Sequence, residues 1–364
     1  MRCFTGVGNF LKDSNALSTA VNGLFDPCLI IFTAPFEFFK DTACKLSEMF
    51  PNAKVIGGVA ETVVNDLDTE GNVSVLAFFS SDSIVSVGVI PEIDKYPVRM
   101  VKELEESADT VNAGDSDTVC FEMCTGSEEC LMTTMNSVFE SRGIATFGAT
   151  ACAPGYAKKM VSYNEQVYDN ACVYAVIKNR RGKVKIYREN IYEVESDFAH
   201  VVTKANREKR IIEELDDRPA CEVYAEETGF DLKNRTGATI MKPMGRAIGK
   251  EVYIFAIKKV DENGSIHTHR AVNENDEVYI LGLCDYDRKT QQTVDGIKNQ
   301  FGKASLVIAA NCVHRHRMFV RERFANEYYG RISKVCDSQF CIVSGGEQYM
   351  NQHVNQTMVC AVFE

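Results

Sequence analysis

The sequence has no stretch that could anchor or export the chain. Its longest apolar run covers residues 28–36, and a bilayer needs about 20 apolar residues in a helix. The first six residues carry one arginine with no apolar segment behind it, so they do not form a secretory signal peptide. We therefore expect a cytoplasmic protein that does not insert into a membrane.

The sequence also lacks an excess of basic charge. It has 51 acidic residues against 40 basic ones, a formal net charge of −11. This balance argues against nucleic acid and anionic membranes as partners, because both carry negative charge. No P-loop is present, and Gly6-Val7-Gly8 lacks the third glycine of a dinucleotide fingerprint. We expect no cofactor.

Cysteine is the residue type that stands out, since 14 are present and no Cys-x-x-Cys pair occurs among them. Without export they should be reduced. Several lie inside apolar runs, such as Cys28 before three aliphatic residues and Cys360 near the end of the chain. We expect most of them to pack as small hydrophobic residues.

A pattern of strand, helix, strand, polar loop and strand occurs three times. The first repeat has strands at 28–34, 54–58 and 73–79, with a helix that ends at 50. The second has strands at 118–123, 144–148 and 171–177, with a helix at 127–140. The third has strands at 305–312, 340–346 and 357–363, with a helix that ends at 329. The first strands are continuous apolar runs, which is typical of strands buried on both faces. The first two strands of each repeat should be parallel and the closing strand antiparallel.

These patterns predict an α/β protein with mixed sheets built from repeated strand-helix-strand-strand units. The length suggests two domains, and we expect two tightly associated modules, 1–190 and 196–364. The region 200–283 differs from the repeats. It should contain a short helix at 218–228 and a hairpin of 251–260 and 265–272, with Asn263-Gly264 at its turn.

Glycine ends the second strand of each repeat, at Gly57-Gly58, Gly148 and Gly345-Gly346. Glycine permits a close approach of ligand or backbone, and ligands of open α/β sheets bind at the carboxyl ends of parallel strands. We expect turns there whose backbone N–H groups line a pocket. Tight turns without a ligand are the alternative.

The third repeat supplies the polar side chains. Arg315 follows a buried strand and could bind a carboxylate, whereas Glu347 could bind an ammonium group. Asn355 and Thr357 offer directional hydrogen bonds. This set suits a small zwitterion or carboxylate. A basic, solvated helix face around Arg315 is the alternative.

Cysteine and histidine in the same region leave two other interpretations open. Cys312, His314 and His316 alternate and would lie on one face of an extended chain, where they could bind zinc. His267 and His269 alternate in the same way on the hairpin. Cys312 could also be a nucleophile with His314 as its base, although no third orienting group is identifiable.

Two motifs stand out in the N-terminal half: the glycine-rich segment 55–61, ending in Glu61, and Phe147-Gly-Ala-Thr-Ala at 147–151. Both resemble motifs of the FIST family of sensory proteins, which have an N-terminal and a C-terminal FIST domain. Four further motifs follow in the C-terminal half: 214–220 with Tyr224, Lys242-Pro-Met-Gly, Cys312-x-x-Arg315, and Gly346-Glu347 with 353–357. Together they extend over nearly the whole chain.

The resemblance implies a sensor of small ligands in intracellular signal transduction, with amino acids as the ligand class, and no established catalysis. Because the sequence stops one residue after its last predicted strand, we expect no attached output domain and a signal passed to a partner protein or through an oligomer. An enzyme using Cys312, or a scaffold for a partner, are the alternatives. The predicted ligand-binding residues are Gly57, Gly58, Glu61, Gly148, Ala149, Cys312, Arg315, Gly346, Glu347, Asn355 and Thr357.

Overall fold

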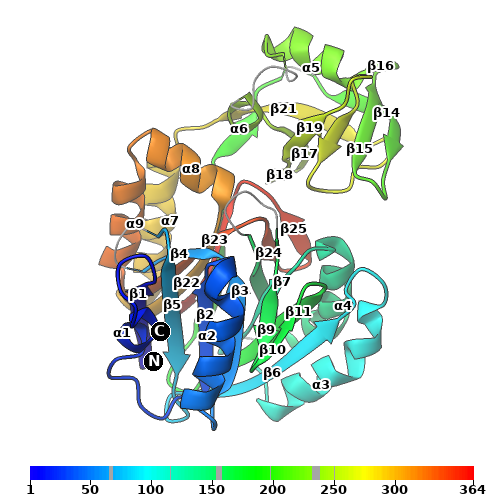
Figure 1. Cartoon of the computed structure of the whole chain (residues 1–364). Coiled ribbons are helices and arrows are strands. Elements are labelled where there is room, and N and C mark those ends of the chain that lie inside the picture. The colour runs from blue at the N-terminus through cyan, green and yellow to red at the C-terminus, as the bar shows by residue number, and fades with distance from the viewer. Residues whose placement is uncertain (65–68, 115, 153–157, 197, 232–237, 250) are drawn as a thin grey trace. The chain divides into compact units, whose positions relative to one another are not determined.

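The structure is a computed structural model that describes residues 1–64, 69–114, 116–152, 158–196, 198–231, 238–249 and 251–364 (Figure 1). The chain forms two compact units. The first contains Met1–Arg188, Gln291–His353 and Met358–Glu364, and the second contains Glu189–Thr290 and Val354–Thr357. The expected module boundary between 190 and 196 stays a prediction.

The three predicted repeats are present, all in the first unit. The first consists of β2 (Leu29–Ala34), α2 (Phe36–Met49), β3 (Lys54–Val59) and β5 (Asn72–Phe78). The second consists of β7 (Thr118–Cys124), α4 (Glu128–Phe139), β8 (Ala145–Thr150) and β11 (Ala171–Asn179). The third consists of β22 (Ala304–Cys312), α8 (Val313–Arg321), α9 (Ala325–Lys334), β23 (Cys336–Ser344) and β26 (Met358–Phe363).

The predicted strand directions are confirmed in every repeat. The first and second strands pair in parallel, as β2 with β3, β7 with β8 and β22 with β23. The closing strands β5, β11 and β26 pair antiparallel with the first strand of their own repeat. β2 and β7 are buried along their whole length, which explains why they read as continuous apolar runs.

Each repeat also donates a short strand to the sheet of another repeat. β4 (Glu61–Val63) of the first repeat pairs with β23 of the third. β9 (Val161–Tyr163) of the second pairs with β3 of the first, and β24 (Glu347–Tyr349) of the third pairs with β8 of the second. The three sheets are therefore linked in a cycle, which fixes the strand ends of all three repeats relative to one another.

Further strands complete these sheets. The strand orders are β1-β5-β2-β3-β9-β10, β25-β24-β8-β7-β11-β6 and β12-β26-β22-β23-β4. The added strands are β1 (Cys3–Asn9), β6 (Ser83–Pro91), β10 (Gln166–Tyr168), β12 (Val184–Glu189) and β25 (Gln352–Val354).

Helices pack on the outer face of the first two sheets. α1 (Ala16–Ala20) and α2 cover one face of the first sheet with residues such as Leu17, Phe39 and Leu46. α3 (Val101–Thr110) and α4 pack against β7 and β11 through Leu104, Leu131 and other buried side chains (Figure 1). This amphipathic packing accounts for the helical periodicity of those segments.

The second unit has a nine-stranded sheet with the order β18-β17-β21-β14-β15-β20-β19, to which β13 and β16 also pair. The strands are β13 (Tyr192–Val194), β14 (His200–Asn206), β15 (Ile211–Leu215), β16 (Arg218–Pro219), β17 (Met244–Ile248), β18 (Glu251–Phe255), β19 (Ile257–Val260), β20 (Ile266–Thr268) and β21 (Glu277–Leu283). The helices are α5 (Ala220–Thr228), α6 (Ala238–Met241) and the start of α7 (Tyr286–Phe301).

Both elements predicted for this region are confirmed, with one difference. α5 matches the predicted helix, and Gly264 has φ +88° in the turn between the antiparallel strands β19 and β20. The first hairpin strand is divided at Ala256, so β18 pairs with β17 while only β19 pairs with β20. None of the helices in the described parts of the chain combines the length and the apolar character that crossing a membrane requires.

Candidate functional site

Backbone hydrogen bonds join the ends of β3, β8 and β23, one strand from each repeat. The backbone N–H of Cys152 donates to the carbonyl of Val59, the last residue of β3 (2.8 Å). The N–H of Gly345, directly after β23, donates to the carbonyl of Thr150 at the end of β8 (2.9 Å). Ligands of α/β sheets bind at the carboxyl ends of strands. We call this place the strand-end site.

Four charged side chains lie close enough to Cys152 in the strand-end site to influence the pKa of its thiol. This pKa is raised to about 11, chiefly by burial; the cations Lys159 and Arg317 lower it, and the carboxylates Glu61 and Glu347 raise it. Cys152 itself is buried and packs with Val313 and Val343. The thiol is therefore protonated at neutral pH, and its surroundings carry charges of both signs.

Glu347 is a fully buried carboxylate held by defined contacts. Its Oε1 accepts a hydrogen bond from the Ser344 hydroxyl (2.7 Å), and its backbone is paired with Ala149 of β8. The neighbouring Gly346 carbonyl accepts a hydrogen bond from the N–H of Thr150 (2.8 Å). The structure thus brings Gly148, Ala149, Gly346 and Glu347 together, as two adjacent strand segments.

A second group of polar side chains lies where α4 begins, and we call it the α4 cluster: Glu128, Glu129, Thr150, Gln348 and His353. Gln348 Nε2 donates to Thr150 Oγ1 (3.0 Å), and this hydroxyl donates to Glu128 Oε1 (3.0 Å). His353 Nδ1 lies 3.7 Å from Glu129 Oε1. Glu128 and His353 are each only 3% exposed.

Glu122, in the middle of β7, is a third buried acid. Its pKa is raised to about 8, chiefly by burial and also by the charge of Glu128. Its Oε2 accepts a weak hydrogen bond from the Cys172 thiol (3.3 Å). A carboxyl group with this pKa is mostly protonated at neutral pH.

The prediction of turns at the glycines of the first and second repeats is wrong. Gly57 and Gly58 lie inside β3 and Gly148 lies inside β8, with paired strands on both sides. A Cβ on Gly57 would lie 2.3 Å from the Phe32 ring, and one on Gly148 would lie 2.3 Å from a carboxylate oxygen of Glu122. These glycines make room for neighbouring side chains of the core. Whether their N–H groups bind a ligand stays untested.

Gly345 and Gly346 do lie between strands, after β23 and before β24, as expected. A Cβ on Gly346 would lie 2.6 Å from His353 Nε2. The absence of a side chain here therefore leaves space for the imidazole ring of His353.

Arg315 is not on a solvated helix face, because it is completely buried. Its Nη1 donates to Asn311 Oδ1 (3.1 Å), and its guanidinium carbon lies 4.9 Å from the centres of both the Phe319 and Tyr328 rings. These contacts between α8, α9 and β22 give it a structural role. Arg317, two residues further on, is exposed and is one of the charges around Cys152.

The zinc alternative required Cys312, His314 and His316 to lie on an extended chain, and this arrangement is not found, because α8 begins at Val313. Cys312 is the N-cap residue of that helix, and residues two apart on a helix point in different directions. Burial, followed by the charge of Arg317, lowers the pKa of both histidines to about 4. His316 Nδ1 lies 2.8 Å from the Tyr329 hydroxyl.

The remaining predicted residues lie in two places. Glu61 is in β4, opposite Val343 of β23, and its Oε2 accepts a hydrogen bond from Thr69 (3.0 Å). Asn355 and Thr357 belong to the second unit, where both are buried. Binding of a ligand by these residues stays a prediction.

Sequence reasoning missed the residues that the strand pairing adds to these sites. Cys152, Lys159 and Arg317 surround the strand-end site, and Glu128 and Glu129 begin α4. The sequence does contain one local signal for Glu128 and Glu129. They directly follow Gly126-Ser127, at the start of the predicted helix, and acidic residues favour the first turn of a helix. No local pattern links them to His353, more than 220 residues away.

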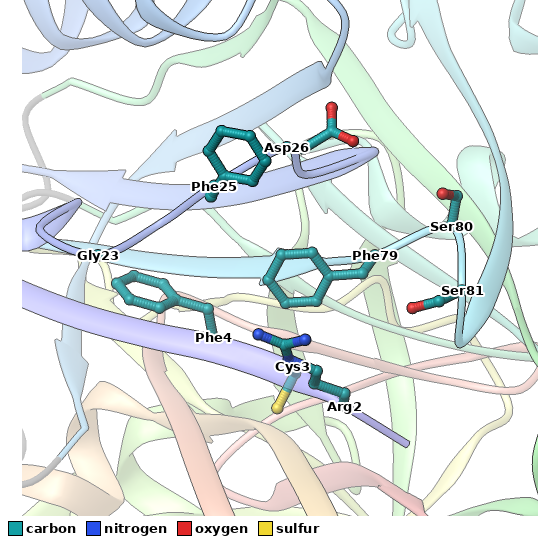
Figure 2. A pocket seen from close by; sticks show the side chains of 9 residues that line it. All are labelled: Arg2, Cys3, Phe4, Gly23, Phe25, Asp26, Phe79, Ser80 and Ser81. Atoms are coloured by element: carbon teal, nitrogen blue, oxygen red, sulfur yellow. The ribbon is translucent and has the colours of Figure 1, made fainter.

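A cavity of about 310 Å³ lies elsewhere, between β1 and the loop at Gly23 and Asp26. Figure 2 shows the rings of Phe4, Phe25 and Phe79 at this cavity, and the Arg2 guanidinium lies 5.0 Å from the Phe79 ring centre. Phe25 is 84% exposed. None of the predicted ligand-binding residues lines this cavity.

Comparison with known proteins identifies both halves of the chain. The FIST N domain matches residues 28–218, and the FIST C domain matches residues 220–350. No curated protein matches the chain. One solved structure, described as a chorismatase at 1.08 Å resolution, is 7% identical and covers 100% of this chain and 98% of its own, with a TM-score of 0.40.

A second, PurLQS from Thermotoga maritima, is 10% identical and covers 99% of this chain and 71% of its own, with a TM-score of 0.22. Both TM-scores are too low to support an argument about function.

Proposed function

Since the chain belongs to the FIST family, whose domains are sensory domains of signalling proteins, we propose that it senses amino acids or related small carboxylates. The matches to both FIST domains, which extend over nearly the whole chain, carry the sensory role. The ligand class is supported by the charges of the strand-end site. The partner protein that receives the signal stays a prediction.

The charges around Cys152 suit a ligand that carries both signs. Arg317 and Lys159 provide cations for a carboxylate, and Arg317 is exposed. Glu347 and Glu61 provide carboxylates for an ammonium group. An amino acid presents these two groups on one carbon atom, so the four side chains offer a complementary set.

This proposal moves the carboxylate-binding role from Arg315 to Arg317. The guanidinium of Arg315 lies between two aromatic rings and donates to Asn311, and in that position it stabilises the packing of α8. Arg317 belongs to the same helix and carries the same charge, but it is exposed and influences Cys152.

The rigidity of the site supports recognition rather than catalysis. Its strand ends are fixed by backbone hydrogen bonds between three repeats, and the acid Glu347 is buried and bonded to Ser344. The Cys152 thiol stays protonated, and His314 in α8 stays neutral, at physiological pH. A fixed binding site loses little conformational entropy when a ligand binds.

A thermal-shift screen with the common amino acids and small carboxylates tests this proposal. A compound at a 100-fold excess over its dissociation constant should stabilise the wild-type chain by about 2.7 kcal/mol. The Arg317→Gln variant should lose about half of this stabilisation or more at the same ligand concentration, because its affinity should fall about ten-fold or more. The matched control is Arg321→Gln, because Arg321 lies one turn further along α8, is exposed, and contacts Glu322 (3.1 Å).

A further inference from the structure

The α4 cluster contains a set of side chains that can bind a metal ion. Among the described residues, Glu128, Glu129 and His353 form a group whose possible ligand atoms all lie within 4.8 Å of one another. The two glutamates come from the first turn of α4, and the histidine comes from β25. All three belong to the first unit.

The spacing between His353 and Glu129 fits two ligands of one ion. Their facing atoms, Nδ1 and Oε1, are 3.7 Å apart, which exceeds the length of a hydrogen bond. Two ligands bound to a transition metal at about 2.1 Å are roughly 3.4 to 3.7 Å apart in a tetrahedral or slightly wider arrangement. The pair therefore needs little movement to share an ion.

A second observation comes from Gln348, which is fully buried beside Glu128. Its Nε2 donates to Thr150 Oγ1, and that hydroxyl donates to Glu128 Oε1, which fixes the amide next to the cluster. The Oε1 atom of Gln348 is buried and has no hydrogen-bond partner among the described residues. A buried acceptor left without a partner is destabilising, and a cation or its bound water would satisfy it.

The acidic residues alone do not require a metal, because carboxylates at a helix N-terminus are favourable with the helix dipole. That effect does not explain the histidine. The ring of His353 is 3% exposed and is accommodated over Gly346, where any Cβ would lie 2.6 Å from Nε2. An imidazole and a carboxylate buried together beside an amide oxygen are typical of a site for a divalent cation.

We propose that Glu128, Glu129 and His353 bind one divalent transition-metal ion, with Gln348 Oε1 as a further ligand or as the acceptor of a bound water. The oxygen-rich donor set with a single imidazole suits Mn²⁺ and Zn²⁺. This proposal does not rest on the proposed sensing of small ligands, since the metal site uses different side chains. Either one can fail alone.

Mn²⁺ is the probe of choice because cysteine thiols bind it weakly, whereas Zn²⁺ would also bind thiolates such as that of the exposed Cys130. The full-length protein is first freed of metal with EDTA, and the EDTA is then removed. Free Mn²⁺ is measured by its electron paramagnetic resonance signal during a titration at neutral pH. The wild-type chain should bind close to one ion.

The His353→Gln and Glu129→Gln variants should each bind Mn²⁺ at least about ten-fold more weakly. His267→Gln is the matched control: His267 is also partly buried and also contacts a carboxylate, Asp261 (2.6 Å), but it lies in the second unit. It should bind Mn²⁺ as the wild type does. At one Mn²⁺ concentration the thermal midpoint should also rise in the wild type and the control, and should rise less in the two variants.

Two results would overturn the proposal. One is a wild-type chain that removes no Mn²⁺ from solution at millimolar concentrations. The other is equal binding by the wild type and Glu129→Gln, a variant that should fold because Glu129 is partly exposed. Binding of Zn²⁺ that is unchanged in His353→Gln and Glu129→Gln also contradicts it, because that result points to a thiolate site.

Discussion

Replacement of Glu122 by glutamine should stabilise the protein at neutral pH. This carboxyl group is completely buried in β7, and its pKa is raised to about 8 by burial and then by the charge of Glu128. Glutamine has nearly the same shape and cannot ionise. The substitution therefore removes the titration and keeps most of the packing.

The sign of the effect follows from the two pKa values of Glu122. In the unfolded chain this group ionises near its ordinary pKa of 4.5, whereas in the folded chain it stays protonated up to about 8. Between these values the unfolded state binds fewer protons, so stability falls as the pH rises. Between about pH 5 and about pH 7.5 the free energy of unfolding of the wild type should fall by about 3 kcal/mol because of Glu122, and that of Glu122→Gln should not show this fall.

Urea unfolding of both proteins at these two pH values measures this difference, with EDTA present so that no bound cation affects Glu122. Other titrating groups are common to both proteins and cancel in the comparison. Glu105→Gln, at an exposed position in α3, is the matched control and should show no such change. A stability difference between wild type and Glu122→Gln that is the same at both pH values would refute a protonated Glu122.

Three further predictions concern packing, pH and thiol reactivity. Gly148→Ala should destabilise the protein by about 2 kcal/mol or more in urea unfolding, because the new Cβ would lie 2.3 Å from a carboxylate oxygen of Glu122. The control Gly330→Ala, in α9 with open space around it, should stabilise the protein by about 0.5 to 1 kcal/mol. Equal effects of the two substitutions would contradict the assigned role of Gly148. The pKa of His314 and His316 is lowered to about 4 in the folded chain, so between about pH 6.5 and pH 4 only the unfolded state takes up their protons. In the Glu122→Gln protein, where Glu122 no longer titrates, the free energy of unfolding should therefore fall by about 2 kcal/mol per histidine between neutral pH and about pH 5. A free energy of unfolding that does not change over this range would show that both histidines are charged in the fold. A thiol reagent should label the exposed Cys130 much faster than buried cysteines such as Cys312, and fast labelling of Cys312, detected by peptide mass spectrometry, would instead favour the enzyme alternative.

The sequence was sufficient to predict the repeats because their signals are local. Continuous apolar strands such as β2 and amphipathic helices such as α2 can be read within one window of residues. Parallel pairing of the first two strands then follows from the intervening helix. The hairpin turn at Gly264 is equally local.

The exchange of short strands between repeats could not be predicted in this way. β4 and β24 have only three residues each, and β4 pairs with residues about 280 positions away. Such a contact leaves no periodic pattern in the sequence. Because these exchanged strands build the strand-end site, the composition of that site was also only partly predictable.

Two errors have the same physical origin. Gly148 reads as the end of a strand, but the strand continues to Thr150 with paired strands on both sides, and the residue is glycine because the Glu122 side chain occupies the space where a Cβ would lie. For Arg315 the alternative of a solvated helix face is wrong, because the rings of Phe319 and Tyr328 and the amide of Asn311 accommodate its charge in the interior, whereas its predicted binding of a carboxylate stays untested. In both cases a tertiary contact overrides the ordinary preference of the residue.

The most direct test of the central claim is isothermal titration of amino acids and small carboxylates into the wild-type, Arg317→Gln and Arg321→Gln proteins. The account predicts saturable binding of at least one of these compounds to the wild type and to Arg321→Gln, and a loss of about ten-fold or more in affinity for Arg317→Gln, which corresponds to about 1.4 kcal/mol. Binding that is unaffected by Arg317→Gln, or no binding of any of these compounds to the wild type, would contradict it.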